Sequence, residues 1–320
     1  MKKFQSAFCG AALAFLAFDS SASCGAAFCL VNTDWSAQGA WLEPGARFDL
    51  RYEYIDLDQP MSGTRRVAVG EIPAHHDEVQ TINHNLVASV DWTITPAWGV
   101  AFTLPYVDRE HHHNHNHQGE VEPESWYFRE IGDARVQARY EFMASREDPA
   151  APRSAGLTFG VKLPTGKYDV VNDEGEAAER TLQPGTGTTD FLAGLYWNGA
   201  APIEGWSWFT RAAVVLPMNE RAGFKPGRQF SLDAGVRYAM GNDVGLMLQA
   251  NYLAKGRDSG DQAEPEDSGQ RILSLSPGIS WNFAKSAQAY AFVQVPVYQS
   301  VNGVQLTADW SAMAGVSWRF

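Results

Sequence analysis

The stretch that decides the fold runs Asp133-Ala134-Arg135-Val136-Gln137-Ala138-Arg139-Tyr140-Glu141-Phe142, and it alternates polar and apolar side chains without a break. Successive side chains of a β-strand point to opposite faces, so this segment has one charged face and one apolar, partly aromatic face. A strand in a soluble β-sandwich rarely combines so apolar a face with so charged an opposite face. The alternation therefore favours a strand in the wall of a membrane barrel, with lipid on its apolar side.

The same alternation recurs on both sides of this stretch. It covers residues 47–54, 86–94, 98–106, 134–142, 157–163, 189–197, 206–216, 230–238, 244–252, 273–281, 289–297 and 308–320. Most connections alternate between short and long, as in barrels that pair short periplasmic turns with longer external loops. The sequence predicts an all-β fold over residues 46–320, a transmembrane antiparallel up-and-down β-barrel of about 12 strands, of the bacterial outer-membrane type.

The two ends of the chain agree with this location. The last segment ends on Phe320 and resembles the closing strand of bacterial outer-membrane proteins, in which a terminal Phe belongs to the assembly signal. At the other end, Lys2 and Lys3 precede an apolar run and a group of small residues, which is the layout of a secretory signal. We expect a signal peptide over 1–23, a periplasmic segment over 24–45, and insertion in the bacterial outer membrane.

Composition excludes some classes of function. The 320 residues carry a formal net charge of -12, which argues against nucleic acid as a partner because phosphate binding relies on basic surface. No stretch approaches the roughly 18 consecutive apolar residues of a membrane-spanning helix. A soluble protein or a barrel surrounded by outer-membrane lipid remains.

Two cysteines, Cys24 and Cys29, follow the expected cleavage region with four residues between them. A local disulfide in the oxidising periplasm is one interpretation. A contact with a metal or haem protein at the periplasmic mouth is the other.

Polar residues at the alternate strand positions are expected to line the lumen. They are Asp49, Arg51, Glu53, Asp91, Asp133, Arg135, Arg139, Glu141, Arg211, Asp233 and Arg237. Acids and bases are close to balance along this lining, whereas a wide selective pore usually shows one sign in excess. The balance predicts ion pairs that join opposite walls of a narrow barrel and partly fill it.

All eight histidines lie between His75 and His117. We place His75, His76 and His84 in or beside one external loop, and the others in the next loop along the chain. Neutral imidazoles suit Zn, Cu or Ni, and Asp77, Glu78, Glu110 and Glu120 could add oxygen ligands. The predicted ligands of a divalent metal are His75, His76, His111, His112, His113, His115 and His117. The alternative is a polar loop that binds no metal, and no other cofactor is expected.

Enzymatic chemistry is not expected. No strand carries a His-x-Ser pair of the kind that hydrolytic barrels need near their rim. The glycine-containing runs 162–167 and 186–190 are strand ends without a following helix, so they are not phosphate loops.

Three segments of the central chain resemble a known family. They read Ile-Gly-Asp-Ala-Arg-Val at 131–136, Gly-Leu-Thr-Phe-Gly-Val-Lys-Leu-Pro-Thr-Gly at 156–166, and Gly-Thr-Gly-Thr-Thr-Asp-Phe at 185–191. Their pattern is similar to that of the outer-membrane barrel family labelled for the meta-pathway of phenol degradation. The resemblance implies a transporter-like barrel for aromatic or other hydrophobic compounds.

The sequence thus predicts an outer-membrane channel for passive passage of a small solute, hydrophobic or aromatic. Two alternatives remain open. One is a surface barrel that binds metal through its His-rich external loops, and the other is a non-conducting barrel that scaffolds a periplasmic redox partner through residues 24–41.

Overall fold

A computed structural model describes residues 45–73, 76–117, 120–145 and 153–320 of the chain. The expected signal peptide, Cys24, Cys29 and His75 lie outside these ranges. None of the described residues belongs to a helix long and apolar enough to cross a membrane.

The described chain contains fifteen strands. They are β1 (Gly45–Leu57), β2 (Gln59–Gly63), β3 (Arg65–Arg66), β4 (His76–Thr93), β5 (Trp98–His117), β6 (Glu120–Ile131), β7 (Arg135–Ser145), β8 (Arg153–Lys162), β9 (Asp190–Ala200), β10 (Trp206–Pro217), β11 (Gln229–Met240), β12 (Val244–Lys255), β13 (Gln270–Ala284), β14 (Ala287–Thr307) and β15 (Ser311–Arg319).

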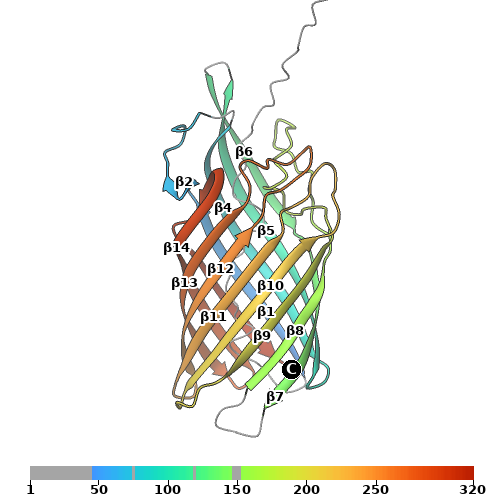
Figure 1. Cartoon of the computed structure of the whole chain (residues 1–320), viewed down its shortest axis with the longest axis vertical. Helices are drawn as coiled ribbons and strands as arrows, with labels where there is room; N and C mark the ends of the chain where they lie inside the picture. Colours follow the sequence, from blue (N-terminus) through green and yellow to red (C-terminus); the bar gives the residue numbers. More distant parts are fainter. Residues whose placement is uncertain (1–44, 74–75, 118–119, 146–152) are drawn as a thin grey trace, which may run out of the picture.

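Twelve of these strands close an antiparallel barrel. Each of these strands pairs with the next barrel strand along the chain, with β1 beside β4 and the lower part of β5 beside β7. The last strand, β15, pairs with β1 and closes the barrel. The wall therefore has no open edge, as a lipid-surrounded sheet requires. The predicted barrel and its strand number are confirmed (Figure 1).

The two ends of the barrel differ. At the turn end, short turns such as 241–243 and 285–286 join the strands, and the Phe320 amide donates to the Ala46 carbonyl at 2.8 Å. At the loop end, longer connections and the small β2–β3 hairpin rise above the wall (Figure 1). Gly241 takes φ 68° in one of the short turns, a conformation that glycine adopts without strain.

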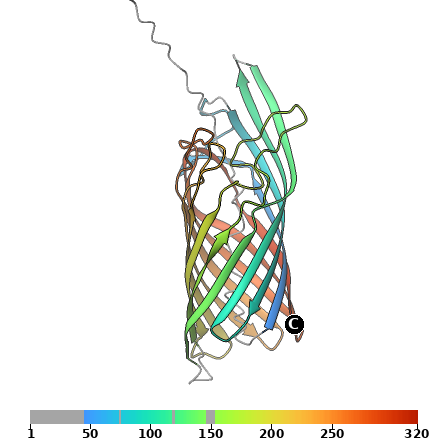
Figure 2. The same ribbon diagram turned by 90° about the vertical axis from the view of Figure 1, so that its right-hand side faces the viewer.

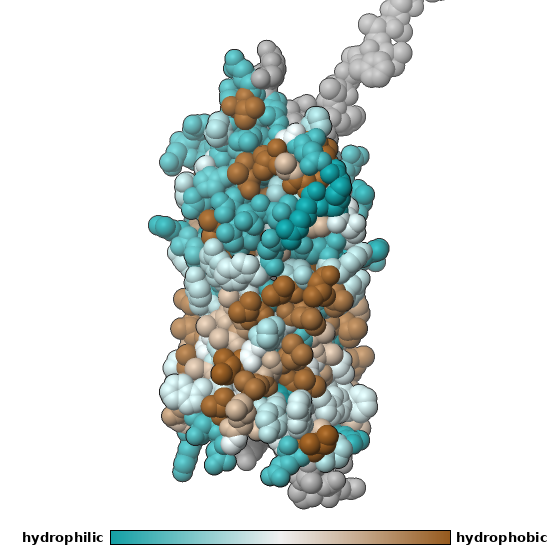
Figure 3. Space-filling view, turned by 90° about the vertical axis from the view of Figure 1, so that its left-hand side faces the viewer, coloured by the Kyte–Doolittle hydropathy of each residue, from teal (hydrophilic) through white to brown (hydrophobic). Residues whose placement is uncertain are grey.

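The faces of the wall are inverted relative to a soluble protein. Trp92 is 58% exposed and Leu246 is 45% exposed, whereas Asn83, Gln249 and Ser276 are buried. Figure 3 shows apolar side chains gathered on one face of the wall, below a largely hydrophilic loop end. An apolar outer face and a polar inner face are what a barrel in lipid needs.

The predicted charge pairing takes a different form in the structure. Arg51 Nε lies 2.7 Å from Glu53 Oε1, and Arg139 Nη1 lies 3.8 Å from Glu141 Oε2. Each pair joins residues two apart on one strand, so these ion pairs run along the wall rather than between opposite walls. Side chains two apart on a strand share a face and lie close enough to pair. Pairing across the lumen stays a prediction.

The His-rich region is also built differently from the expected loops. The upper part of β5 pairs with β6, from Tyr106 opposite Ile131 to His117 opposite Glu120, while β4 continues beside it up to His76. These three strands form an extension above the barrel, which projects at the top of Figure 2. His76, His84, His111, His112, His113, His115 and His117 therefore lie on strands. Apolar alternation marks only the lipid-facing part of a strand, whereas backbone pairing continues beyond it.

Candidate functional site at the loop end

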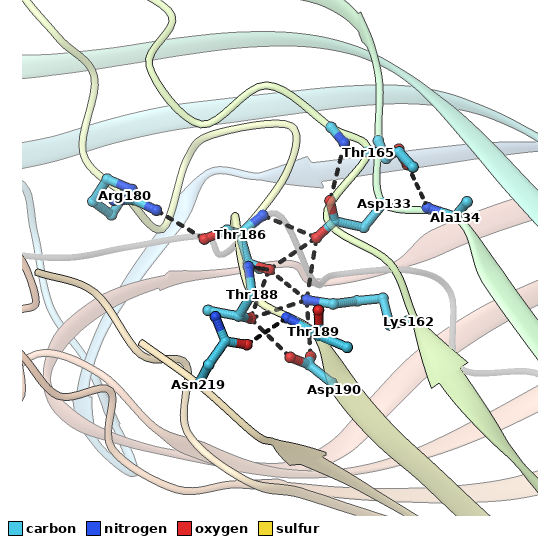
Figure 4. Close-up of polar contacts among 12 residues, drawn as sticks. Asp133, Ala134, Lys162, Thr165, Arg180, Thr186, Thr188, Thr189, Asp190 and Asn219 are labelled. Atoms are coloured by element: carbon cyan, nitrogen blue, oxygen red, sulfur yellow. Dashed lines mark hydrogen bonds and ion pairs between the residues drawn. The ribbon is translucent and has the colours of Figure 1, made fainter. Parts of the chain in front are cut away.

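A buried polar network holds the top of the wall together around Lys162, the last residue of β8. The Lys162 ammonium lies 2.8 Å from Asp190 Oδ2 and 3.1 Å from Asp133 Oδ2, and it donates to the Thr186 hydroxyl. Figure 4 shows these side chains converging from three separate segments. One ammonium thus lies between two buried carboxylates.

Hydroxyl and amide groups complete this network. Asp133 accepts hydrogen bonds from the Thr186 amide at 2.9 Å, the Thr186 hydroxyl at 2.8 Å and the Gly166 amide at 3.0 Å. The Thr188 hydroxyl donates to Asp190 at 2.7 Å. Donors of this kind stabilise ionised carboxylates away from water. The arrangement is a structural clamp for the segments that it joins.

Two glycines allow the backbone to pass through the clamp. A Cβ atom on Gly166 would lie 2.8 Å from the Gly185 Cα, and one on Gly185 would lie 2.5 Å from the Gly166 carbonyl oxygen. Only residues without a side chain permit this approach. The three segments that carry the family resemblance therefore meet at one place. Their sequence pattern does not predict that Lys162 and Asp190 pair.

Residues 163–189, here called the mouth loop, are tied to strands β5 and β4 of the wall. Leu182 is fully buried, and its carbonyl accepts a hydrogen bond from the buried Arg109 guanidinium of β5. Arg109 Nε also donates to Asn83 Oδ1 of β4 at 2.6 Å. Within the loop, burial is the main cause that raises the pKa of Glu179 well above its usual range, and the charge of Glu78 adds to it.

Apolar side chains form a cluster on the inside of this otherwise polar barrel. Its buried members are Ile55, Leu57, Trp126, Phe128, Ala178, Leu182, Met247, Tyr290, Phe292, Leu306 and Met313. The cluster joins the wall strands to the mouth loop and to β6.

Part of this cluster forms one level across four adjacent strands. Met247 of β12 is opposite Gly278 of β13, which is opposite Phe292 of β14, which is opposite Met313 of β15. A Cβ atom on Gly278 would lie 2.3 Å from the Phe292 ring, so the ring occupies the space above the glycine. The lumen wall is apolar across these four strands, and Arg237 of β11 and Glu53 of β1 lie beside them in the same row.

The structure brings together only some of the histidines. His111 and His113 are buried beside Glu78, whereas His112 lies on the other face of β5 and contacts Glu110 and Ser125 at 2.7 Å. His115 Nδ1 lies 3.5 Å from Glu124, a residue of β6 whose pKa is raised first by burial and then by the charge of Glu176.

His84 does not join this group. His84 Nδ1 shares a hydrogen bond of 2.7 Å with the Tyr52 hydroxyl on the outside of the wall. His76 and His117 lie at the ends of β4 and β5, and the structure does not describe their side chains. Of the four acids expected to add oxygen ligands, Glu78 is the one beside His111 and His113.

The sequence of the chain matches a known protein family. Residues 87–308, more than half of it, match the family described as "Putative MetA-pathway of phenol degradation". The chain belongs to this family. No curated protein matches its sequence.

A solved structure shares the fold of this phenol-degradation family barrel. The COG4313 outer membrane channel from Pseudomonas putida F1 is similar with a TM-score of 0.66 at 10% identity, over 90% of this chain and 99% of that one. The KdgM porin has a TM-score of 0.43 at 10% identity, over 86% and 99%. The protein is a bacterial outer-membrane β-barrel, so its loop end is the extracellular end.

Proposed function

We propose that this family barrel is a passive outer-membrane channel for a small apolar solute, with aromatic compounds in its range, and not an enzyme. The carrying observation is the buried apolar cluster on the inside of the barrel, with Met247, Phe292 and Met313 at one level. The name of the Pseudomonas putida relative, an outer membrane channel, supports the same class.

The lining favours such a solute over an ion. Luminal charges are partly neutralised by ion pairs along the wall, such as Arg51 with Glu53, which leaves little selectivity by charge sign. An apolar solute, in contrast, gains from contact with buried apolar surface inside the barrel. Because the mouth loop is tied to Arg109, we expect a narrow entrance and small single-channel currents.

Solute uptake by vesicles whose outer leaflet is lipopolysaccharide tests this function, because that leaflet slows the unassisted entry of apolar solutes. Labelled toluene uptake should be faster with the barrel than without it, and Phe292→Ala should change the rate several-fold. Phe102→Ala is the matched control, because it removes the same ring from the lipid-facing side of the wall, where Phe102 is exposed. Equal rates for protein-free and barrel-containing vesicles would refute the channel.

Conductance in planar bilayers separates the remaining alternatives. Small currents with weak ion preference are expected, and they should rise when Arg135 and Arg139 are both shortened to Ala. Absence of both current and solute flux would favour the scaffold for a periplasmic partner. In that hypothesis the partner binds residues 24–41 of this chain, which lie outside the described ranges.

A further inference from the structure

A second cluster of buried titratable side chains lies in the extracellular extension, away from the clamp around Lys162. Glu78 comes from β4, and His111 and His113 come from β5. All three are buried, and one ligand atom of each lies within 4.8 Å of the others. One carboxylate and two imidazoles form a donor set that suits a borderline divalent cation.

The spacing of the donor atoms fits a metal shell. His111 Nε2 lies 3.4 Å from Glu78 Oε2 and 3.3 Å from His113 Nδ1. Ligands held about 2.0 to 2.1 Å from a tetrahedral Zn²⁺ are separated from each other by about 3.4 Å. Both short separations match that value.

The far nitrogen of each imidazole is also anchored. His111 Nδ1 lies 2.9 Å from the Thr81 hydroxyl, and His113 Nε2 lies 2.9 Å from Glu124 Oε2. Metal-binding histidines in proteins typically donate their second N–H to a carboxylate or another oxygen acceptor, which fixes the tautomer. If both histidines donate outward here, their lone pairs point at each other and at Glu78, and a cation between them stabilises that arrangement.

Trp126 of β6 covers the cluster. Its ring centroid lies 4.7 Å from that of His113 and 5.9 Å from that of His111, and its indole N–H donates to the Glu176 carbonyl of the mouth loop at 3.1 Å. The cluster is therefore shielded by a large aromatic ring, which strengthens electrostatic attraction inside it.

We propose that Glu78, His111 and His113 bind one divalent transition-metal ion of the Zn²⁺ type, with Thr81 and Glu124 as positioning residues. Three protein ligands leave a fourth position for water or an added ligand, as in open zinc sites. The site is buried within a paired hairpin, in contrast to adventitious binding by exposed histidines. It goes beyond the channel function and does not depend on it.

The competing explanation uses a proton in place of the metal. The Thr81 hydroxyl could donate to His111, His111 Nε2 to His113 Nδ1, and His113 Nε2 to Glu124, which would satisfy the same contacts. Such a chain binds no metal, so direct titration distinguishes the two.

The experiment titrates the folded full-length mature barrel in detergent, after chelator treatment, with Zn²⁺ by calorimetry and with Co²⁺ by visible absorption. One tight Zn²⁺ per barrel and the intense bands of tetrahedral Co²⁺ are expected. A double variant, His111→Gln with His113→Gln, should lose both signals, and Glu124→Gln should weaken Zn²⁺ binding by about 10- to 100-fold.

His112→Gln is the matched control, because His112 lies between the two ligands in sequence but on the opposite face of the strand. It should bind Zn²⁺ like the parent. Heat-modifiable migration in gels checks that each variant forms the barrel. Equal Zn²⁺ binding by the parent and the double variant, or no tight binding by the parent, would overturn the site.

Discussion

The loop end contains two buried clusters of titratable side chains whose chemistry differs. In the clamp, the Lys162 ammonium lies between Asp133 and Asp190, and threonine hydroxyls and backbone amides complete the hydrogen bonding. In the extension, Glu78 lies beside the imidazoles of His111 and His113. A buried carboxylate needs a positive partner. The clamp contains an ammonium, whereas the extension cluster offers two imidazoles that suit a bound metal ion.

The largest expected effect comes from removing the cation of the clamp. Lys162→Met leaves two buried carboxylates without their ammonium, which should lower the free energy of unfolding by about 3 to 5 kcal/mol. Urea titration of the folded barrel measures it. Lys167→Met is the control, because Lys167 pairs with Glu130 at the exposed surface, where such a pair contributes about 0 to 1 kcal/mol. Similar losses in the two variants would remove the distinction between the clamp and a surface ion pair.

The next effect concerns the excess of buried negative charge near Glu78. Burial raises the pKa of Glu179 in the folded barrel above 4.5, its pKa in the unfolded chain. The neutral form of Glu179 therefore contributes its full stability below pH 4.5, and this contribution is lost as pH rises through the pKa of the folded state. Glu179→Gln removes that loss, so the variant should be more stable than the parent at pH 8 and equal to it at acidic pH. Urea midpoints in the presence of a chelator measure this. Parallel pH curves for parent and variant would contradict it, and Glu174→Gln, at an exposed position of the same loop, is the control.

A pair of matched threonine substitutions sharpens the comparison. Thr186→Val removes a hydroxyl that bonds both Asp133 and Lys162, which should cost about 1 to 3 kcal/mol of stability. Thr81→Val removes the hydroxyl beside His111 and should chiefly weaken Zn²⁺ binding. Urea midpoints and Zn²⁺ affinities of both variants would be compared. The reverse pattern, with Thr81→Val the more destabilising and metal binding unchanged, would assign a structural role to the extension cluster.

The smallest effect is expected at the link between the extension and the mouth loop. Trp126→Phe keeps an aromatic ring over the histidines but removes the N–H that bonds Glu176, a hydrogen bond of about 1 kcal/mol. Zn²⁺ affinity should then fall by less than tenfold. A loss as large as that of the double histidine variant would mean that the mouth loop, and not the hairpin, holds the ligands in place.

The barrel was predictable because period-2 alternation extends over nearly every strand, and the outer face from Trp92 to Trp310 is apolar as expected. The extension was not, because β4 and β5 leave the lipid there and their sequence no longer alternates between apolar and polar. His111 and His113 were predicted as ligands together with His112, and only strand pairing reveals that the middle residue faces the other way. The clamp depends on contacts between residues up to 53 positions apart, which no local pattern encodes.

The upper part of β6 has one further consequence. In the described part of the chain β6 pairs with β5 alone, so its other edge resembles the exposed border at which β-proteins add foreign strands and aggregate. Its outermost residues are Glu120, Val121, Glu122 and Pro123, all exposed. Two carboxylates repel a second copy of the same edge, and proline offers no N–H to it. The hairpin can therefore stand above a crowded cell surface without recruiting its neighbours into a shared sheet.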